Sequence, residues 1–246
     1  MKFRTSITQI KDGREIVRGK DLNDWVKSGK TFAEAIFLLL RGKEPTENET
    51  KMMNALLSIA IDHGPGTASG MTSRIVASAK NSMHTSVAAG ILAMGDRHGS
   101  AIEGAMKILY EQETRNKKQE TNLREEIRQM KDQKIKIPGY GHSVLEHDYR
   151  ADTLFEIAKK TGFFGKHCEL ALTVQEELNT ISSKKLPLNV DGAMAAVLCD
   201  MGFDARLAKG LFIIARTPGL VAQVYEEMVN DEGLRRLAES DIEYMS

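Results

Sequence analysis

The sequence PGYGHSV at residues 138–144, followed closely by Arg150, is the stretch around which this chain is organised. Its proline and glycines disfavour both helix and strand, so we expect a sharp turn that holds His142 away from the backbone. An arginine such as Arg150 can bind a carboxylate through two parallel hydrogen bonds. A glycine-rich surface loop that carries a histidine would show the same pattern. Two later stretches, LNVDG at 188–192 and IARTPG at 214–219, favour a functional site.

Composition excludes several classes of protein. The 246 residues are enough for one or two domains with a sizeable core, and Lys+Arg and Asp+Glu balance at 34 each, so no net charge favours nucleic acid or an anionic membrane. The two cysteines, Cys168 and Cys199, lie in apolar, helix-like segments, which indicates a reducing compartment and no disulfide framework. No signal peptide is evident, and the longest apolar run, 35–40, is too short to span a bilayer. We expect a soluble cytoplasmic protein.

Helical patterns dominate after a hairpin signal at Asp12 and Gly13. Thr31 and Glu34 have the spacing of a capping box, and Gly42 follows where that helix should end. Further helices are expected over about 46–60, 69–95, 101–110, 152–160, 168–178, 191–199, 205–215 and 220–229, with a solvated helix pair within 111–136. No strand-like alternation extends over the body of the chain, so we predict an all-α fold.

Polar residues lie where glycines interrupt the apolar helices: His63, His98, His142, Arg150, Asp191 and Arg216. Each has a simpler explanation: Asp191 could cap a helix, His98 could be a plain loop residue, and Arg216 could complement a helix dipole. A metal site is a rival interpretation of the three histidines. The sequence has no HExxH and no paired CxxC spacing, so we expect no metal.

These segments, taken in order along nearly the whole chain, resemble the citrate synthase family. Residues 17–46 resemble the family's N-terminal signature, and 62–78 its substrate-histidine loop with the helix after it. The correspondence continues with His98-Gly99 at the first catalytic histidine, GYGH at 139–142 at the second, NVD at 189–191 at the catalytic aspartate and ART at 215–217 at an arginine turn. The resemblance implies an all-α, citrate-synthase-like fold with a large and a small helical domain.

The resemblance also implies carbon–carbon bond chemistry between acetyl-CoA and oxaloacetate. Asp191 would exchange a proton with the acetyl methyl group, and His98 would donate to the thioester oxygen of the enol. His142 would polarise the oxaloacetate carbonyl or accept the proton of the tertiary hydroxyl of citryl-CoA. The coenzyme A thioester is a substrate, and no tightly bound cofactor is expected.

Binding roles are implied in the same way. Arg150, Arg216 and His63 would bind the substrate carboxylates, and Arg236 resembles an arginine that reaches into the partner's site across a dimer. Coenzyme A would be bound by Gly139, Gly141, Lys184 and Lys185. A solvated lysine pair is the favoured explanation of Lys184 and Lys185.

Departures from the family pattern separate two directions of the reaction. The chain is shorter than ordinary citrate synthases, and the loop around His98 reads GDRHGS. Residues 183–192 and the ending at 241–244 resemble citryl-CoA lyase and the C-terminal module of ATP-citrate lyase. We therefore expect cleavage of citryl-CoA to acetyl-CoA and oxaloacetate. The alternatives are citrate synthase activity on oxaloacetate or a close 2-oxo acid, and a non-catalytic subunit that binds coenzyme A.

The predicted domain division follows from the same resemblance. Residues 1–100 and 190–246 would form the large helical domain and residues 101–189 the small one, with the catalytic groups at their junction. Small residues in 78–90 and 193–199 suit close helix packing, and a homodimer or a higher homo-oligomer is expected.

Overall fold

A computed structural model describes residues 1–245 except 96, 97, 100, 119–122, 134, 142–146 and 183, with the backbone alone at 116–118. Contacts divide the chain into two compact units: unit 1 is Met1–Leu57 with Ile102–Ala208, and unit 2 is Ser58–Ala101 with Lys209–Ser246. The division expected from the sequence, 1–100 with 190–246 against 101–189, has other boundaries and stays a prediction.

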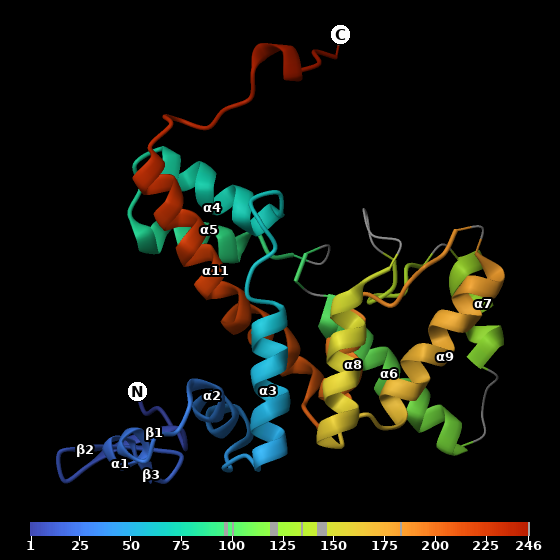
Figure 1. Ribbon diagram of the computed structural model, residues 1–246, viewed down its shortest axis with the longest axis horizontal. Helices are drawn as coiled ribbons and strands as arrows, with labels where there is room; N and C mark the ends of the chain where they lie inside the picture. The colour runs from blue at the N-terminus through green and yellow to red at the C-terminus, as the bar shows by residue number, and fades with distance from the viewer. Residues whose placement is uncertain are drawn as a thin grey trace. The chain divides into compact units, whose positions relative to one another are not determined.

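The described residues are mostly helical, as predicted (Figure 1). In unit 1 the elements are β1 (Thr8–Lys11), β2 (Arg14–Val17), β3 (Lys20–Asp21), α1 (Leu22–Lys27), α2 (Phe32–Arg41), most of α3 (Glu47–Ile59), α6 (Ala101–Lys118), α7 (Leu123–Asp132), α8 (Tyr149–Thr161), α9 (Lys166–Ile181), α10 (Val190–Asp200) and η1 (Ala205–Leu207). In unit 2 they are α4 (Ala68–Ser78), α5 (Met83–Leu92), α11 (Ala208–Asn230) and η2 (Glu239–Asp241).

The predicted hairpin is present at the N-terminus. β1 and β2 pair antiparallel up to Lys11 opposite Arg14, and β3 adds to β2 in the order β1-β2-β3. The two turn residues both have positive φ, 51° at Asp12 and 72° at Gly13. A two-residue turn with this backbone matches the twist of antiparallel strands, which explains why Asp-Gly predicts a hairpin.

The capping box of α2 is also confirmed. The Thr31 hydroxyl accepts from the backbone N–H of Glu34, and the Glu34 carboxylate accepts from the N–H of Thr31. The helix ends at Gly42 in the left-handed conformation. Arg18 donates from Nε and Nη2 to the carbonyl of Leu39 at 3.1 and 2.8 Å, which ties the sheet to α2.

α10 is the central helix of unit 1. Its residues from Ala193 to Leu198 are at most 1% exposed, and it packs against α8 and α9. A helix that is apolar on every side must be buried, so the sequence of α10 fixes its place in the interior. Its first turn carries Asp191, one of the predicted catalytic residues.

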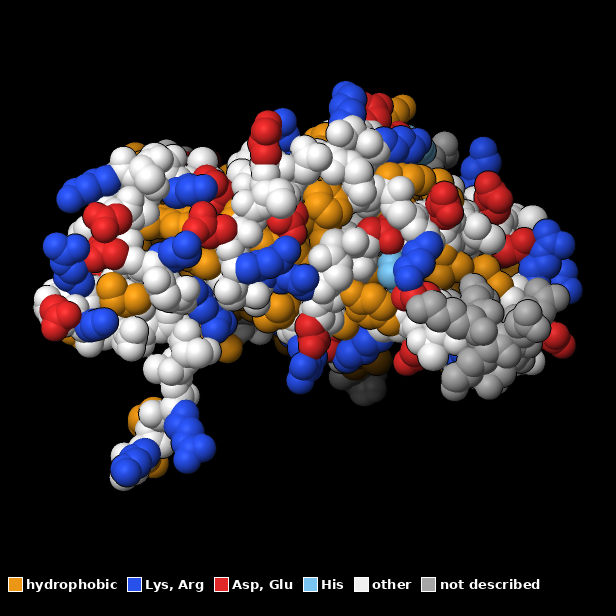
Figure 2. All heavy atoms as spheres, turned by 90° about the horizontal axis from the view of Figure 1, so that it is seen from below, with side chains coloured by type: hydrophobic (Ala, Val, Ile, Leu, Met, Phe, Trp, Pro, Cys, Tyr) orange, Lys and Arg blue, Asp and Glu red, His pale blue; other side chains and the backbone are white. Residues whose placement is uncertain are grey.

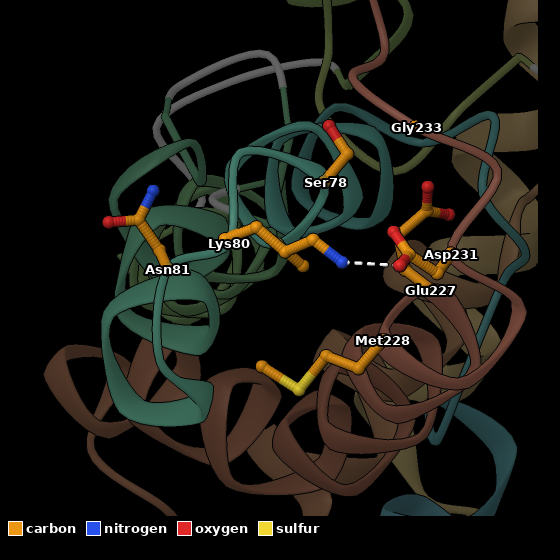
Figure 3. Close-up of a pocket in the computed structure, with 8 residues that line it drawn as sticks. Ser78, Lys80, Asn81, Glu227, Met228, Asp231 and Gly233 are labelled. Carbon is orange, nitrogen blue, oxygen red and sulfur yellow. Dashed lines mark ion pairs between the residues drawn. The ribbon is translucent and has the colours of Figure 1, made fainter.

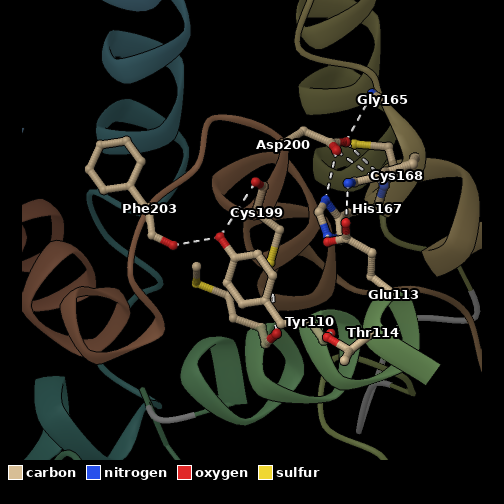
Figure 4. A network of polar contacts seen from close by, with 11 residues as sticks. Tyr110, Glu113, Thr114, Gly165, His167, Cys168, Cys199, Asp200 and Phe203 are labelled. Atoms are coloured by element: carbon tan, nitrogen blue, oxygen red, sulfur yellow. Dashed lines mark hydrogen bonds and ion pairs between the residues drawn. The ribbon is translucent and has the colours of Figure 1, made fainter. Parts of the chain in front are cut away.

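The other end of α10 is held by a network of polar contacts (Figure 4). Asp200 accepts from the backbone N–H groups of Gly165, His167 and Cys168 at 2.9 to 3.1 Å, so it caps α9. The ring of His167 lies between two carboxylates, with Nδ1 2.8 Å from Asp200 and Nε2 3.0 Å from Glu113. These bonds join α6, α9 and α10 in a rigid frame, since each partner is buried or nearly so.

Both cysteines belong to this frame. Cys168 and Cys199 are free and buried. Burial raises the pKa of the Cys199 thiol to about 12 and raises that of Cys168 as well. The two thiols are therefore protonated at neutral pH and serve in packing.

Unit 2 is built from α4, α5 and α11 (Figure 1). The single helix expected over 69–95 was wrong: the chain turns between α4 and α5. Lys80 has φ 63°, the Asn81 side chain donates to the carbonyl of Val76 at 3.0 Å, and Ser82 precedes the next helix. An asparagine side chain competes well for backbone groups, and here Asn81 bonds the end of α4 just before α5 begins.

The break expected in α11 was also wrong. The helix runs from Ala208 to Asn230 with Pro218 inside it. Proline removes one helical hydrogen bond, and the adjacent Thr217 hydroxyl donates to the carbonyl of Ile213 at 2.7 Å. Arg216 therefore lies in the middle of a helix, and an interaction with the dipole at a helix end does not explain it.

Within the described residues, the segment Ala205–Asn230 is long and apolar enough to cross a membrane by length and composition, unlike the shorter run at 35–40. Half of its most apolar window is buried inside the protein, and its buried residues include Arg216 and Glu227. A core helix passes the same test, so this is weak evidence for a membrane span.

On the face drawn in Figure 2, basic and acidic side chains are interspersed.

α4 and α5 approach closely through small residues. A Cβ atom built on Gly90 would lie 2.0 Å from Ser73 Oγ, 2.8 Å from the carbonyl of Ser69 and 3.2 Å from Leu220 Cδ1. The contact therefore depends on the missing side chain at Gly90. By contrast, nothing lies within 4 Å of a Cβ built on Gly210 in α11.

We expect Gly90→Ala to lower the free energy of unfolding by about 1–3 kcal/mol, because the added methyl group overpacks the contact between α4 and α5. Gly210→Ala is the matched control and should raise it by about 0.5–1 kcal/mol, since alanine is the better helix former. Urea unfolding followed by circular dichroism measures both. Equal effects of the two substitutions would contradict the close packing at Gly90.

Candidate active site

The first turn of α10 places Asp191 beside the glycine-rich loop. Asn189 caps the helix, because its Oδ1 accepts from the N–H of Gly192 at 3.1 Å. The Asn189 Nδ2 donates to the carbonyl of Gly141 at 2.8 Å, and its backbone N–H donates to Gly139 at 3.0 Å. One residue thus starts the helix and fixes the loop, and the partly buried Asp191 lies next to both.

Two glycines allow this close approach. Gly139 has φ 89°, and a Cβ on it would lie 2.7 Å from Gly192 Cα. A Cβ on Gly192 would lie 2.4 Å from the carbonyl oxygen of Gly139. Gly141 has φ 83°, and its N–H donates to Pro187 at 2.8 Å. The loop backbone therefore lies against the segment before α10, while His142, the next residue, is outside the described residues.

Arg150 lies in the first turn of α8, in the same unit. Its Nε and Nη2 are each 2.9 Å from the carboxylate of Asp148, which is 1% exposed. The same carboxylate accepts from the backbone N–H of Val190 at 2.8 Å. Unit 1 therefore brings Arg150, Asp191 and the glycine-rich loop together.

Unit 2 brings together His98 and Arg216. His98 Nε2 lies 2.8 Å from the hydroxyl of Ser69, which is fully buried in α4. The rings of His98 and Phe212 meet edge to face at 6.2 Å, and the guanidinium of Arg216 lies 4.9 Å from the same phenyl ring. Arg216 is 4% exposed and donates from Nε to the carbonyl of Ala60 at 2.8 Å. Arg216 is therefore part of the packed interior of unit 2, whereas His98 is partly buried.

The surroundings of His98 favour its neutral form. Burial lowers its pKa below the ordinary 6.5, and the positive charges of Arg216 and His63 lower it further. His63 itself is exposed. When the Ser69 hydroxyl donates to Nε2, the single proton of neutral His98 is on Nδ1, which can then donate to a substrate oxygen.

The remaining predicted residues lie at the surface. Lys184 and Lys185 are exposed, and Arg236 is exposed beside a cavity of about 390 Å³ in unit 2. The other residues that line this cavity are Pro65, Met71, Arg74, Ile75, Arg235 and Leu237. The roles given to Arg236 and the two lysines stay predictions.

A second cavity in unit 2, of about 230 Å³, lies beside the ends of α4 and α11 (Figure 3). Lys80 and Asp231 form an ion pair of 2.5 Å there. No predicted site residue lines it. Among the residues that the structure describes, no group of three or more His, Cys, Asp or Glu side chains is arranged to hold a metal.

Four residues of the site received no role from the sequence. Asn189 and Asp148 are N-caps, and each could have been found from an Asn or Asp directly before a predicted helix. Ser69 and Phe212 carry no such signal, because a small residue and an aromatic residue in apolar helices predict only packing. Their contacts with His98 required the folded structure.

Comparison with known proteins shows the family of this chain. The family model described as "Citrate synthase, C-terminal domain" matches residues 26–238. Citrate synthase 2 of Bacillus subtilis is 33% identical over 211 residues, which are 85% of this chain and 55% of that protein. The probable ATP-citrate synthase subunit 1 of Neurospora crassa is 29% identical over 260 residues, covering 99% of this chain and 38% of that protein. This chain thus spans about half or less of the length of these relatives.

Solved structures show the same fold. Citryl-CoA lyase from Hydrogenobacter thermophilus matches with a TM-score of 0.89 and 43% identity, over 99% of this chain and 94% of that chain. An ATP citrate lyase from Methanothrix soehngenii, in complex with citrate and coenzyme A, matches with a TM-score of 0.87 and 26% identity, over 100% of this chain and 42% of that chain. The resemblance found in the sequence and the predicted fold are confirmed, and the chain belongs to the citrate synthase family.

Proposed function

We propose that this protein is a citryl-CoA lyase, which cleaves citryl-CoA into acetyl-CoA and oxaloacetate. Identity and coverage together carry the proposal: the chain is 43% identical to a solved citryl-CoA lyase and covers 94% of it, but is 33% identical to the Bacillus subtilis citrate synthase 2 and covers 55% of it. Condensation of acetyl-CoA with oxaloacetate, or with a close 2-oxo acid, is the second candidate, supported by the 33% identity to that synthase. One site stabilises the same transition state in both directions, so the two candidates share their catalytic groups.

In the proposed cleavage, a base takes the proton of the tertiary hydroxyl of citryl-CoA, and the adjacent carbon–carbon bond breaks. The electron pair of that bond passes to the acetyl-CoA fragment as an enolate, and the hydroxyl carbon becomes the carbonyl of oxaloacetate. We assign the base to His142 by resemblance to the family. Protonated Asp191 then delivers a proton to the enolate carbon, which becomes the methyl group.

Charge on the thioester oxygen must be stabilised while the enolate exists. His98 suits this role because it is held by Ser69 and is kept neutral, so it can donate a hydrogen bond. Arg150, Arg216 and His63 would bind the carboxylates of the substrate, and Arg236 would act across a dimer. Coenzyme A would be contacted by Gly139, Gly141, Lys184 and Lys185.

We also propose a cytoplasmic location, in keeping with two free, buried thiols.

The purified protein, given citryl-CoA, should release oxaloacetate faster than free coenzyme A. A lyase must keep water away from the thioester, whereas a synthase completes its reaction by hydrolysing it. Coupled reduction of oxaloacetate to malate and a thiol reagent measure the two products. Asp191→Asn should abolish oxaloacetate release without loss of folding, because an amide cannot deliver the proton. Thiol release in step with citrate formation, with little oxaloacetate, would support the synthase instead.

The proton affinity of His98 gives a pH-dependent prediction. The pKa of His98 is lowered in the folded protein. As the pH falls through the ordinary 6.5, the unfolded chain therefore binds more protons at this residue than the folded protein does, and the contribution of His98 to stability is lost.

Arg216→Gln removes a nearby positive charge and should move the pKa of His98 upward. Arg206→Gln, at an exposed arginine in unit 1, is the control. Titration of the His98 ring signals by NMR measures the shift, and an unchanged pKa in Arg216→Gln would refute this electrostatic account.

We further propose that the protein is a homodimer or a higher homo-oligomer. Val221, Tyr225 and Val229 follow each other at four-residue spacing on α11 and are 40%, 63% and 61% exposed. An apolar stripe of this kind is typical of a surface that a partner covers. Light scattering at micromolar concentration should give a mass of at least twice the 27.3 kDa of one chain. Tyr225→Glu should lower this mass. The control Ile10→Glu, at an exposed residue of β1, should leave the mass unchanged. A monomeric wild-type protein would contradict the proposal.

A further inference from the structure

Asp148 is a buried carboxylate with partners in two helices. Oδ1 accepts from the Nε of Arg150 at 2.9 Å and from its backbone N–H at 3.2 Å. Oδ2 accepts from Arg150 Nη2 at 2.9 Å and from the backbone N–H of Val190 at 2.8 Å. The side chain is 1% exposed, so these bonds are shielded from water. Asp148 therefore binds the guanidinium of Arg150 and the backbone of the first residue of α10 at the same time.

The bond to Val190 uses a group that a helix cannot satisfy itself. The N–H groups of the first turn have no partner within the helix, and a buried one is costly without an acceptor. Asp148 supplies that acceptor for Val190, the residue before Asp191. Burial alone would raise the pKa of the Asp148 carboxyl, but the bonds from Arg150 and Val190 outweigh it and lower the pKa. The carboxylate is therefore ionised at neutral pH, as both of its partners require.

The chain contains a matched example without this link. Asp204 caps η1, accepts from the backbone N–H of Arg206 at 2.9 Å and pairs with its guanidinium at 2.5 to 3.1 Å. The local motif is the same as at Asp148 and Arg150. The side chains of Asp204 and Arg206 are 46% and 85% exposed, however, and Asp204 reaches no second helix in its hydrogen bonds within the described residues. Capping and arginine pairing are thus common to both motifs, and the bond to α10 is particular to Asp148.

We propose that Asp148 is a positioning residue, which fixes the carboxylate-binding Arg150 and the first turn of α10 with Asp191 relative to each other. The inference rests on the proposed function, because it assumes that Arg150 binds oxaloacetate and that Asp191 transfers the proton. Asp148 is 1% exposed, so we assign it no contact with the substrate. It orients the guanidinium with a bidentate pair and holds the helix start with a third bond, so one carboxylate sets the spacing of the two groups.

Asp148→Ser tests this role, with Asp204→Ser as the matched control. Serine keeps an N-cap acceptor, so the helix start is preserved, but its short hydroxyl cannot pair with a guanidinium on two sides. We expect Asp148→Ser to weaken oxaloacetate binding about 30-fold and to lower kcat for citryl-CoA cleavage about tenfold, as is typical when one partner of a buried charge pair is removed. Affinity for coenzyme A should change less than about twofold, and Asp204→Ser should change each quantity less than about twofold. Calorimetry gives the affinities without turnover.

A double-mutant cycle with Arg150→Ala separates positioning from a general structural defect. If Asp148 acts on oxaloacetate through Arg150, Asp148→Ser should weaken oxaloacetate binding less than about twofold once Arg150 is absent. Hydrogen exchange at the first turn of α10 gives a readout that needs no activity: it should accelerate in Asp148→Ser and stay unchanged in Asp204→Ser.

The outcomes distinguish this inference from the proposed function. Wild-type protein that neither binds oxaloacetate nor cleaves citryl-CoA would overturn the proposed function and this role with it. Normal wild-type activity, with equal losses in Asp148→Ser and Asp204→Ser, would overturn the positioning role alone. A full 30-fold effect in the Arg150→Ala background, or an equal loss of coenzyme A affinity, would do the same.

Discussion

The start of α10 is the constraint on which the candidate site of unit 1 depends. Gly139 and Gly192 approach so closely that a side chain on either would collide with the other's backbone. Asn189 caps the helix and bonds the glycine-rich loop, and Asp148 bonds the first helical N–H. These bonds satisfy polar groups that the start of a helix leaves without a partner within the helix. They also join the glycine-rich loop, Arg150 and the first turn of α10 with Asp191 in one framework.

The far end of the same helix explains why that framework is rigid. Asp200 caps α9 and contacts His167, and the ring of His167 continues to Glu113 in α6. Between these two polar ends α10 is wholly apolar and buried. A helix fixed at both ends and packed on every side has little freedom to shift, which suits a residue that must meet a substrate carbon accurately.

Unit 2 presents a different arrangement, in which burial and the charges of Arg216 and His63 lower the pKa of His98. His98, His63 and Arg216 influence one another, and burial keeps His98 neutral. Arg216 is supported by the carbonyl of Ala60 and the ring of Phe212. Perturbed pKa values of this kind cluster at functional sites.

Much of this architecture could be read from the sequence, because local chemistry decided it. Asp12 and Gly13 predicted the hairpin, Thr31 and Glu34 predicted the start of α2, and each of these signals acts within a few residues. The break between α4 and α5 was missed because its signal is confined to Lys80 and Asn81, within a longer stretch of apolar and small residues. Continuity of α11 through Pro218 was missed because tertiary packing outweighs the helix-breaking tendency of proline.

The site was predictable only in part for a related physical reason. Charged and glycine residues at apolar interruptions pointed to Asp191, His98 and Arg150, since burying such residues is costly without a function or a partner. The residues that hold them, Ser69 and Asp148, act over long sequence separations. No local pattern encodes the bond from His98 to Ser69 or the bond from Val190 to Asp148.

A crystal structure with oxaloacetate and a non-reactive acetyl-CoA analogue tests the central claim most directly, namely that the start of α10 and Arg150 form the reaction centre. We predict that a carboxylate of oxaloacetate binds the guanidinium of Arg150 and that the carboxylate of Asp191 faces the carbon corresponding to the acetyl methyl group. Oxaloacetate bound away from Arg150, with another carboxylate beside the methyl position and Asp191 serving only in the first turn of its helix, would contradict the claim.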